Sequence, residues 1–190
     1  MLNSLLLLVA LASAAGEAAP QPSHKPWLDR CATARLLSSW KRDGLWRAAA
    51  VDGPHQEGHK IRYVGMLRAG SRTYKIYFDD NVDPPTHRGH KDLVVTTQGG
   101  KFLGTYNIID TDSEPWRIEG SDILFPPRKD DQGRPYRDRI HFGPKGPPEH
   151  VPILFGWDVE FGTPAEFLKA FPHVKPWPEP GPRISAYCRR

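Results

Sequence analysis

Residues 93–109 read LVVTTQGGKFLGTYNII, and this stretch decides the class of fold. Two runs rich in β-branched and aromatic residues, 93–97 and 102–109, lie on either side of Gly99-Gly100. Such residues are enriched in strands, and paired glycines accept the positive backbone angles of a tight turn. The stretch therefore predicts a β-hairpin.

Further strands are expected on both sides of this hairpin. Residues 61–67 and 73–78 are joined near Gly70-Ser71, a pair that suits a second hairpin turn. Shorter candidates are separated by loops rich in Pro and Gly: 116–119, 122–125, 139–142 and 151–161. This arrangement favours a mostly antiparallel sheet, built from hairpins as a meander, a sandwich or an open barrel.

Helical signals stand near both ends of the chain. Within residues 26–42 apolar side chains recur every four residues, and Asp43-Gly44 is a suitable stop because glycine accepts the left-handed conformation that closes many helices. Residues 163–166, TPAE, form a capping box with Pro at the first helical position. The fold class expected is therefore α+β, a mostly antiparallel sheet with an N-terminal helix and a short C-terminal helix.

The first residues have the pattern of a targeting segment. Leu5–Leu11 is apolar, and small residues follow it directly. These seven residues rise only about 10 Å as a helix, whereas the hydrocarbon core of a membrane is about 30 Å thick. The pattern predicts a signal peptide over 1–15, with cleavage near Ala14 or Ala15, and a single secreted α+β domain over 26–190. We expect the mature chain to be secreted or periplasmic and to have no membrane span.

The chain has two cysteines, Cys31 and Cys188. In an oxidising compartment a solitary pair most simply forms one disulfide, which here would join the two ends of the mature domain. A free thiol and a bridge between two chains are the alternatives.

Composition and charge exclude several classes of protein. The 190 residues include 17 Gly and 20 Pro, and 26 Lys+Arg against 22 Asp+Glu leave a net charge of +4. These values exclude a coiled coil, a collagen-like chain and a strongly charged disordered tail. Residues 128–139 interleave five cations with three anions, which argues against nucleic-acid binding because that needs a patch of one sign. An envelope component or another protein remains open as a partner.

Residues 79–92 form the densest polar cluster in the chain. Carboxylates and imidazoles are ligands for metal ions, and four residues of the cluster are candidates: His87, His90, Asp79 and Asp83. A calcium loop of the EF-hand type is not expected, because Pro84 stands where that loop requires glycine. The alternative is a solvated loop between two hairpins, in which Asp, Asn and Pro form turns.

Asp158 and Glu160 are candidates for a catalytic carboxylate pair. In a strand both lie on one face with their backbones about 7 Å apart, and two carboxylates at such spacing can divide the acid and base roles of glycoside cleavage. The alternative is that both charges face water while the apolar residues between and beside them face the core.

Motifs for other kinds of chemistry are missing from the sequence. It contains no G-x-S-x-G elbow, no P-loop, no G-x-G-x-x-G motif and, around His59, no H-E-x-x-H motif, so no cofactor is expected. We therefore expect a non-enzymatic binding or accessory domain of the cell envelope. Two alternatives stay open. One is a small extracytoplasmic hydrolase that uses a metal at His87 and His90 or the Asp158/Glu160 pair, and the other is a structural subunit of an envelope assembly.

Overall fold

The structure is a computed structural model that describes residues 25–44, 59–82, 89–108, 114–115, 117–153, 157–170 and 188. The signal peptide expected over 1–15 and the metal-ligand candidates Asp83 and His87 lie outside the described residues. Among the helices in the described ranges, none is long and apolar enough to cross a membrane.

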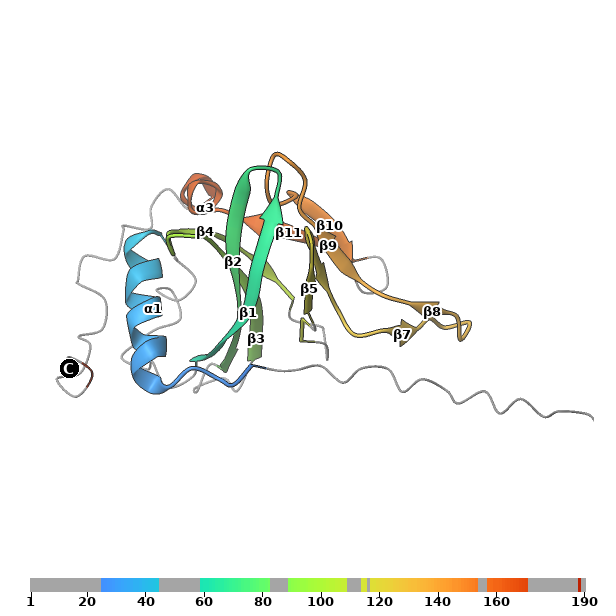
Figure 1. Ribbon diagram of the computed structural model, residues 1–190, viewed down its shortest axis with the longest axis horizontal. Coiled ribbons are helices and arrows are strands. Elements are labelled where there is room, and N and C mark those ends of the chain that lie inside the picture. The colour runs from blue at the N-terminus through green and yellow to red at the C-terminus, as the bar shows by residue number, and fades with distance from the viewer. Residues whose placement is uncertain are drawn as a thin grey trace, which may run out of the picture.

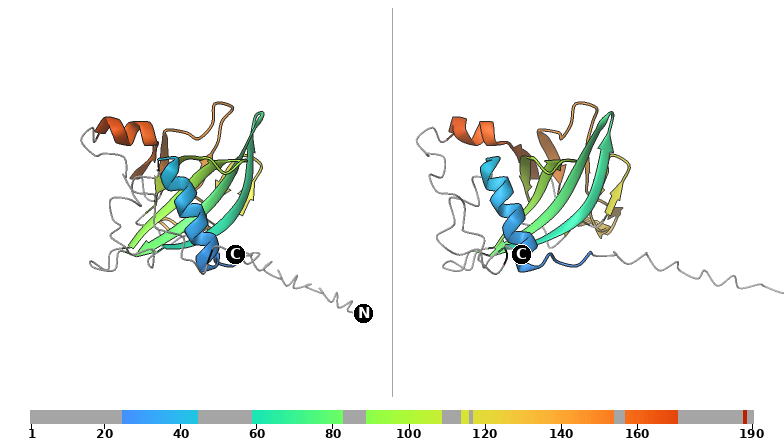
Figure 2. Two further views of the ribbon diagram at one scale, coloured as in Figure 1. Left: turned by 90° about the vertical axis from the view of Figure 1, so that its left-hand side faces the viewer. Right: turned by 60° about the vertical axis from the view of Figure 1, so that its left-hand side comes forward.

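A curved, six-stranded antiparallel sheet is the centre of the fold (Figures 1 and 2). Its strands lie in the order β1-β2-β3-β4-β11-β10, so the first four follow one another along the chain as a meander. The strands are β1 His59–Ala69, β2 Arg72–Val82, β3 Gly89–Thr97, β4 Phe102–Asn107, β11 Trp157–Gly162 and β10 His150–Ile153. Both predicted hairpins are confirmed, and their turns contain Gly70 and Gly100 with φ angles of 57° and 91°, which L-residues rarely adopt.

Two helices lie at the positions that the sequence predicts. α1 spans Arg30–Arg42, begins after its N-cap Asp29, and is followed by Gly44 with a φ of 104°. α3 spans Pro164–Ala170, and the predicted capping box precedes it. The Glu166 carboxylate accepts a hydrogen bond from the Thr163 N–H, and the Thr163 hydroxyl accepts one from the Glu166 N–H. The predicted α+β fold class is confirmed.

The shorter strands form two further sheets. One is a three-stranded antiparallel sheet of β5, β6 and β9, and the other is a hairpin of β7 and β8 that extends away from the large sheet (Figure 1). The strands are β5 Arg117–Glu119, β6 Asp122–Leu124, β7 Arg128–Lys129, β8 Pro135–Tyr136 and β9 Arg139–His141.

The large sheet has a hydrophobic core on each face. On one face α1 lies across the strands (Figure 2), and its Leu37 and Trp40 pack against sheet residues: Ile61, Tyr77, Val94 and Phe102. On the other face the three-stranded sheet covers a core that includes Ile76, Phe78, Leu93, Tyr106, Ile123 and Phe142. Among the described residues, the second core has fifteen buried members and the core under α1 has six. Within the described ranges, the apolar core beneath α1 is therefore the smaller of the two.

A β-bulge in β1 decides which of its side chains face α1. The register of β1 with β2 shifts by one residue between Tyr63 and Gly65, so Val64 is extra. Because side chains alternate between the two faces of a strand, one extra residue exchanges those faces beyond the bulge. Leu67 therefore lies in the larger core, whereas Ile61 lies against α1.

The expectation of one strand over 151–161 is wrong. The structure has β10 and β11 there, an antiparallel pair in which Val151 lies opposite Val159. Pro152 has no N–H to donate to a neighbouring strand, and β10 is accordingly at the edge of the sheet. No Asn-Gly or Gly-Gly pair marks the reversal, so composition alone does not reveal it.

Candidate binding pocket between α1 and β1

A pocket of about 340 Å³ lies between the first turns of α1 and the start of β1. The residues that line it are Trp27, Leu28, Arg30, Thr33, Ala34, Leu37, His59 and Lys60. The lead-in segment before α1 (residues 25–29) is held against β1, because the Leu28 N–H donates a 2.8 Å hydrogen bond to the carbonyl oxygen of Ile61. In Figure 1 this segment passes along the lower end of the sheet. The volume falls within the range of about 300–1,000 Å³ for small-molecule sites.

Part of the pocket wall is apolar. Leu37 is fully buried and Ala34 is buried close to it in α1, whereas Trp27 in the lead-in segment is 41% exposed. Apolar and aromatic residues make up most of the lining of small-molecule sites, and polar groups add specificity. Of these three residues, Trp27 offers that kind of surface to a ligand.

Arg62 holds Trp27 in place from behind the pocket. Its guanidinium carbon lies 5.3 Å from the centre of the Trp27 ring and 5.2 Å from that of Phe78, within the range of cation–π attraction. Burial lowers the pKa of Arg62, and the ion pair with Glu114 opposes that shift. Trp27, the aromatic residue of the pocket, therefore packs against a buried arginine that forms an ion pair.

A buried His–Asp pair belongs to the polar part of the wall. Nδ1 of His59 lies 2.9 Å from one carboxylate oxygen of Asp79 and 3.2 Å from the other. Their side chains are 2% and 7% exposed. A carboxylate only accepts hydrogen bonds, so Nδ1 carries the proton and donates it to Asp79. Asp79 thereby sets the tautomer and orientation of the imidazole, which is how an acid–base histidine is held.

Asp79 is also part of a polar row across the α1-facing side of the sheet. It lies directly opposite Asp92 on β3, and Asp92 lies opposite Asn107 on β4. Like charges at directly opposite positions destabilise a sheet, and His59 offsets that cost at Asp79.

The alternative of a solvated loop over 79–92 is wrong at both of its ends. β2 continues to Val82 and β3 begins at Gly89, and both Asp79 and Asp92 are buried within strands. A buried polar group is tolerated where a partner satisfies it. For Asp79 that partner is on β1, twenty residues away in the sequence, so no local pattern reveals it.

No described contact places the other metal-ligand candidates near Asp79. Asp83 and His87 lie outside the described residues, and of His90 only the backbone is described, opposite Asn81 on β2. In the described part of the chain, no group of three or more His, Cys, Asp or Glu side chains could hold a metal ion. The metal site stays a prediction.

Asp158 and Glu160 both lie exposed on β11, away from the pocket. Glu160 is opposite His150, with 3.9 Å between its Oε1 and the histidine Nδ1, and Asp158 is opposite Pro152. β2, β3 and β4 separate β11 from β1, so these carboxylates do not contribute to the pocket. Their catalytic role stays a prediction.

A second histidine cluster lies on the three-stranded sheet. Ser121 Oγ, at 3.4 Å, and Asp122 Oδ1, at 2.8 Å, both approach the same Nδ1 atom of His141. In a catalytic triad the nucleophile and the carboxylate bind different ring nitrogens. These three residues therefore do not have the geometry of a triad.

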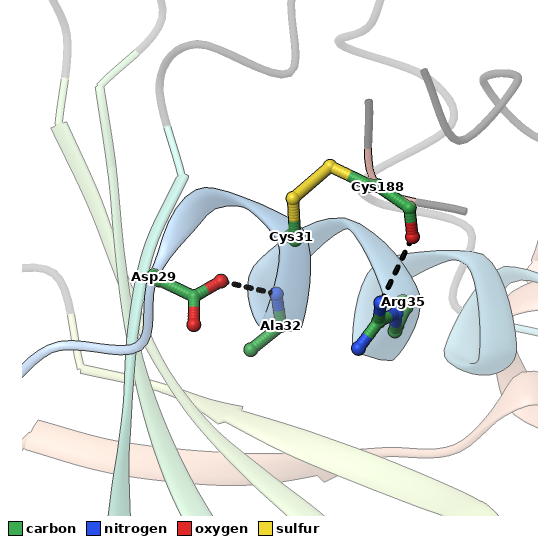
Figure 3. Close-up of a disulfide and its surroundings, with 5 residues drawn as sticks. All are labelled: Asp29, Cys31, Ala32, Arg35 and Cys188. Atoms are coloured by element: carbon green, nitrogen blue, oxygen red, sulfur yellow. Dashed lines mark hydrogen bonds between the residues drawn. A yellow bond between two sulfur atoms is a disulfide. The ribbon is translucent and has the colours of Figure 1, made fainter. Parts of the chain in front are cut away.

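The disulfide that the cysteine count predicts is present beside the pocket (Figure 3). Cys31, in the first turn of α1, is joined to Cys188 with an S–S distance of 2.08 Å. One turn further along α1, Arg35 Nη2 donates a 2.9 Å hydrogen bond to the carbonyl oxygen of Cys188. The chain near the C-terminus is thus fixed to the helix that lines the pocket.

Sequence reasoning missed His59 as a site residue. If the pairing of β1 with β2 is counted back from the Gly70-Ser71 turn without a bulge, Arg62 lies opposite Asp79. His59 then lies on the face of β1 that points away from Asp79. The bulge places Ile61 opposite Asp79 instead. A one-residue shift of this kind leaves no signal in the composition of the strand.

Similarity to known proteins does not indicate a function for the pocket. Comparisons with protein-family models, with curated proteins and with solved structures found no match to this chain. A function for the pocket therefore has to be argued from the residues that line it.

Proposed function

We propose that this chain is a non-enzymatic binding domain of the cell envelope that holds a small ligand in the pocket between α1 and β1. The observation that carries this proposal is the pocket itself, with its volume of about 340 Å³. It combines an apolar surface, which includes Trp27 and Leu28, with hydrogen-bonding groups on Thr33 and His59. That combination is typical of sites that bind small molecules.

A place outside the cytoplasm is part of the proposal. Disulfides persist in oxidising compartments, which supports this location for a chain that joins Cys31 to Cys188. The apolar run and small residues within 1–15 support export by a signal peptide. On this proposal the protein is secreted or periplasmic.

Binding of N-phenyl-1-naphthylamine, a neutral probe that fluoresces in apolar surroundings, tests the proposed pocket. We expect saturable one-to-one binding by the purified, oxidised protein. Ala34→Leu and Thr33→Leu add volume at the pocket wall and should each weaken it. Met66→Ala is the matched control, because Met66 is 52% exposed on β1 and does not line the pocket.

Two results would overturn the proposal. One is the absence of saturable binding by the wild-type protein. The other is undiminished binding by both filling variants when their circular dichroism spectra are native. The second filling variant is included so that misfolding of one does not decide the result.

The His59–Asp79 pair favours a second candidate function, a small extracytoplasmic hydrolase with His59 as its general base. General acid–base catalysis contributes about 10²–10⁴-fold to a rate. If the candidate is right, hydrolysis of p-nitrophenyl acetate falls at least about 100-fold in His59→Gln. The hydrolysis remains in His141→Gln, which removes a second histidine that is bonded to an aspartate in the described part of the chain. A wild-type rate equal to that of His59→Gln excludes the candidate.

A further inference from the structure

We infer that the pocket binds one ring of a neutral saccharide, with a face of the sugar stacked on Trp27 and its hydroxyl groups bound by polar side chains nearby. The inference rests on the proposed binding function and adds the chemical class of the ligand. Three features of the pocket carry it: the exposed aromatic ring in its wall, the balance of charge around it, and its volume.

The apolar surface that a ligand can reach is small and aromatic. Leu37 is fully buried and Ala34 is 6% exposed, whereas Trp27 is 41% exposed. A ligand that depends on extensive apolar burial gains little there, because the hydrophobic effect scales with the area removed from water. The face of an aromatic ring is weakly negative, and it attracts the weakly positive C–H groups on one side of a pyranose ring.

Trp27 is held in place before any ligand binds. The centre of its ring lies 6.1 Å from that of Phe78 and 5.3 Å from the guanidinium carbon of Arg62. The next residue, Leu28, donates its N–H to the carbonyl oxygen of Ile61 at 2.8 Å, which fixes the backbone of the lead-in segment. A side chain that is already ordered loses less conformational entropy on binding. The exposed part of the ring is therefore a preformed surface for stacking.

Charges of both signs surround the pocket. Two cations line it, Arg30 and Lys60. Asp29 precedes the first of them in the chain, and Asp80 on β2 lies opposite the second. A third carboxylate, that of Asp79, is bound to the imidazole of the lining. Because no sign of charge dominates among these described residues, they favour neither an anion nor a cation, and a neutral polar ligand fits them best.

The polar groups and the size of the pocket fit a single sugar unit. The Thr33 hydroxyl both donates and accepts hydrogen bonds, and the Lys60 ammonium donates them. Sugar hydroxyl groups also donate and accept, so they can bind to both side chains. The volume of about 340 Å³ equals that of about eleven water molecules at about 30 Å³ each, which is room for one monosaccharide unit.

Three neutral methyl glycosides test the ligand class: methyl β-D-glucopyranoside, methyl β-D-galactopyranoside and methyl α-D-mannopyranoside. Saturation-transfer difference nuclear magnetic resonance identifies the ligand hydrogens that contact the protein. We expect at least one glycoside to bind with a dissociation constant on the order of 1 mM and to displace N-phenyl-1-naphthylamine. Transfer should be strongest to the C–H groups on one face of its ring. Because the glycoside is uncharged, added salt should not change its affinity.

Variants of Trp27 and Lys60 localise the binding. Trp27→Ala should weaken glycoside binding at least about tenfold, whereas Trp27→Phe should keep part of it, because phenylalanine retains an aromatic face. Lys60→Met should weaken glycoside binding but not binding of N-phenyl-1-naphthylamine, which has no hydroxyl groups. Lys60→Gln should bind the glycoside like the wild type, because glutamine keeps a hydrogen-bond donor. Met66→Ala is the matched control for Trp27→Ala, because it truncates an exposed apolar side chain outside the pocket.

The outcomes separate the inference from the proposed function. Saturable binding of N-phenyl-1-naphthylamine that none of the three glycosides displaces overturns the inference and leaves the binding function standing. Glycoside binding that is unchanged in natively folded Trp27→Ala, or in Lys60→Met if Trp27→Ala does not fold, also overturns it. Failure of all four probes to bind saturably overturns both. Glycoside binding that is lost in Trp27→Ala and retained in Met66→Ala supports the saccharide.

Discussion

At Gly104 a side chain as small as a methyl group would meet the carbonyl oxygen of Gly162 and the ring of Phe161, each at 2.6 Å. One of these neighbours is backbone, so β4 and β11 would have to separate. We expect Gly104→Ala to lower the free energy of unfolding by about 1–3 kcal/mol, which is the usual cost of overpacking. Unfolding in urea measures the change.

Gly99→Ala is the control for this prediction. Gly99 lies in the adjoining turn, and a methyl group there would come no closer than 3.8 Å to Thr97 Oγ1. Its effect should stay within about 0.5 kcal/mol, as for most surface substitutions. Equal stability of the two variants would contradict the role given to Gly104.

Glu166 gives α3 a dependence on pH. Its carboxylate accepts 2.8 Å hydrogen bonds from the backbone N–H and the hydroxyl of Thr163, and the backbone bond contributes most to lowering the pKa of Glu166 from its ordinary value of 4.5. Because the pKa is lower in the folded state, the stabilisation is complete above pH 4.5 and is lost as the pH falls through the folded-state value.

Nuclear magnetic resonance measures the titration of this carboxyl directly. We expect the midpoint of Glu166 in the native protein to lie below its midpoint in the urea-unfolded chain. Hydrogen exchange of the α3 amides should become faster over the same acidic range, because the capping box opens. Identical midpoints in the two states would contradict the prediction.

The faces on which the side chains of β1 lie depend on one extra residue, Val64. Deletion of Val64 would restore an unbroken register with β2, bring Arg62 toward α1, and turn His59 away from the pocket. We expect this deletion to abolish the native near-ultraviolet circular dichroism. Val64→Ala keeps the residue count, so it should retain the native spectrum and lower stability by about 1 kcal/mol. A deletion variant that folds and binds N-phenyl-1-naphthylamine like the wild type would show that the bulge does not position the site.

The elements that the sequence predicts correctly have local causes. The turn glycines, the stop of α1 and the capping box each depend on residues within about four positions of one another. The contacts that the sequence does not reveal are set between strands. The pairing of His59 with Asp79 depends on the bulge, and the reversal between β10 and β11 carries no glycine pair. Burial of Asp79 and Asp92 follows from the same long-range pairing, because β2 continues past Phe78 to Val82 and β3 begins at Gly89, before Leu93.

Across the whole molecule the two faces of the large sheet are held by different means. The three-stranded sheet side has the larger core, whereas α1 contributes only Leu37 and Trp40 to the described buried core beneath it. Polar and covalent contacts add to the apolar packing of α1. Asp43 accepts a 3.0 Å hydrogen bond from the Phe102 N–H at one end of α1, and the disulfide fixes Cys31 at the other. The disulfide is therefore one of the contacts that hold α1, the helix that lines the pocket.

Reduction of the disulfide tests this dependence, because Cys31 and Cys188 are the only cysteines in the chain. The bond closes a sequence separation of 157 residues. We expect dithiothreitol to lower the free energy of unfolding by about 2–4 kcal/mol. We also expect amide exchange to accelerate more in α1 than in β2 and β3. The affinity for N-phenyl-1-naphthylamine should fall, because α1 provides part of the pocket wall. The double variant Cys31→Ser/Cys188→Ser without reductant should give the same pattern. Uniform acceleration in α1 and the strands would mean that the bond acts only by restricting the unfolded chain, and the pocket would then not depend on it.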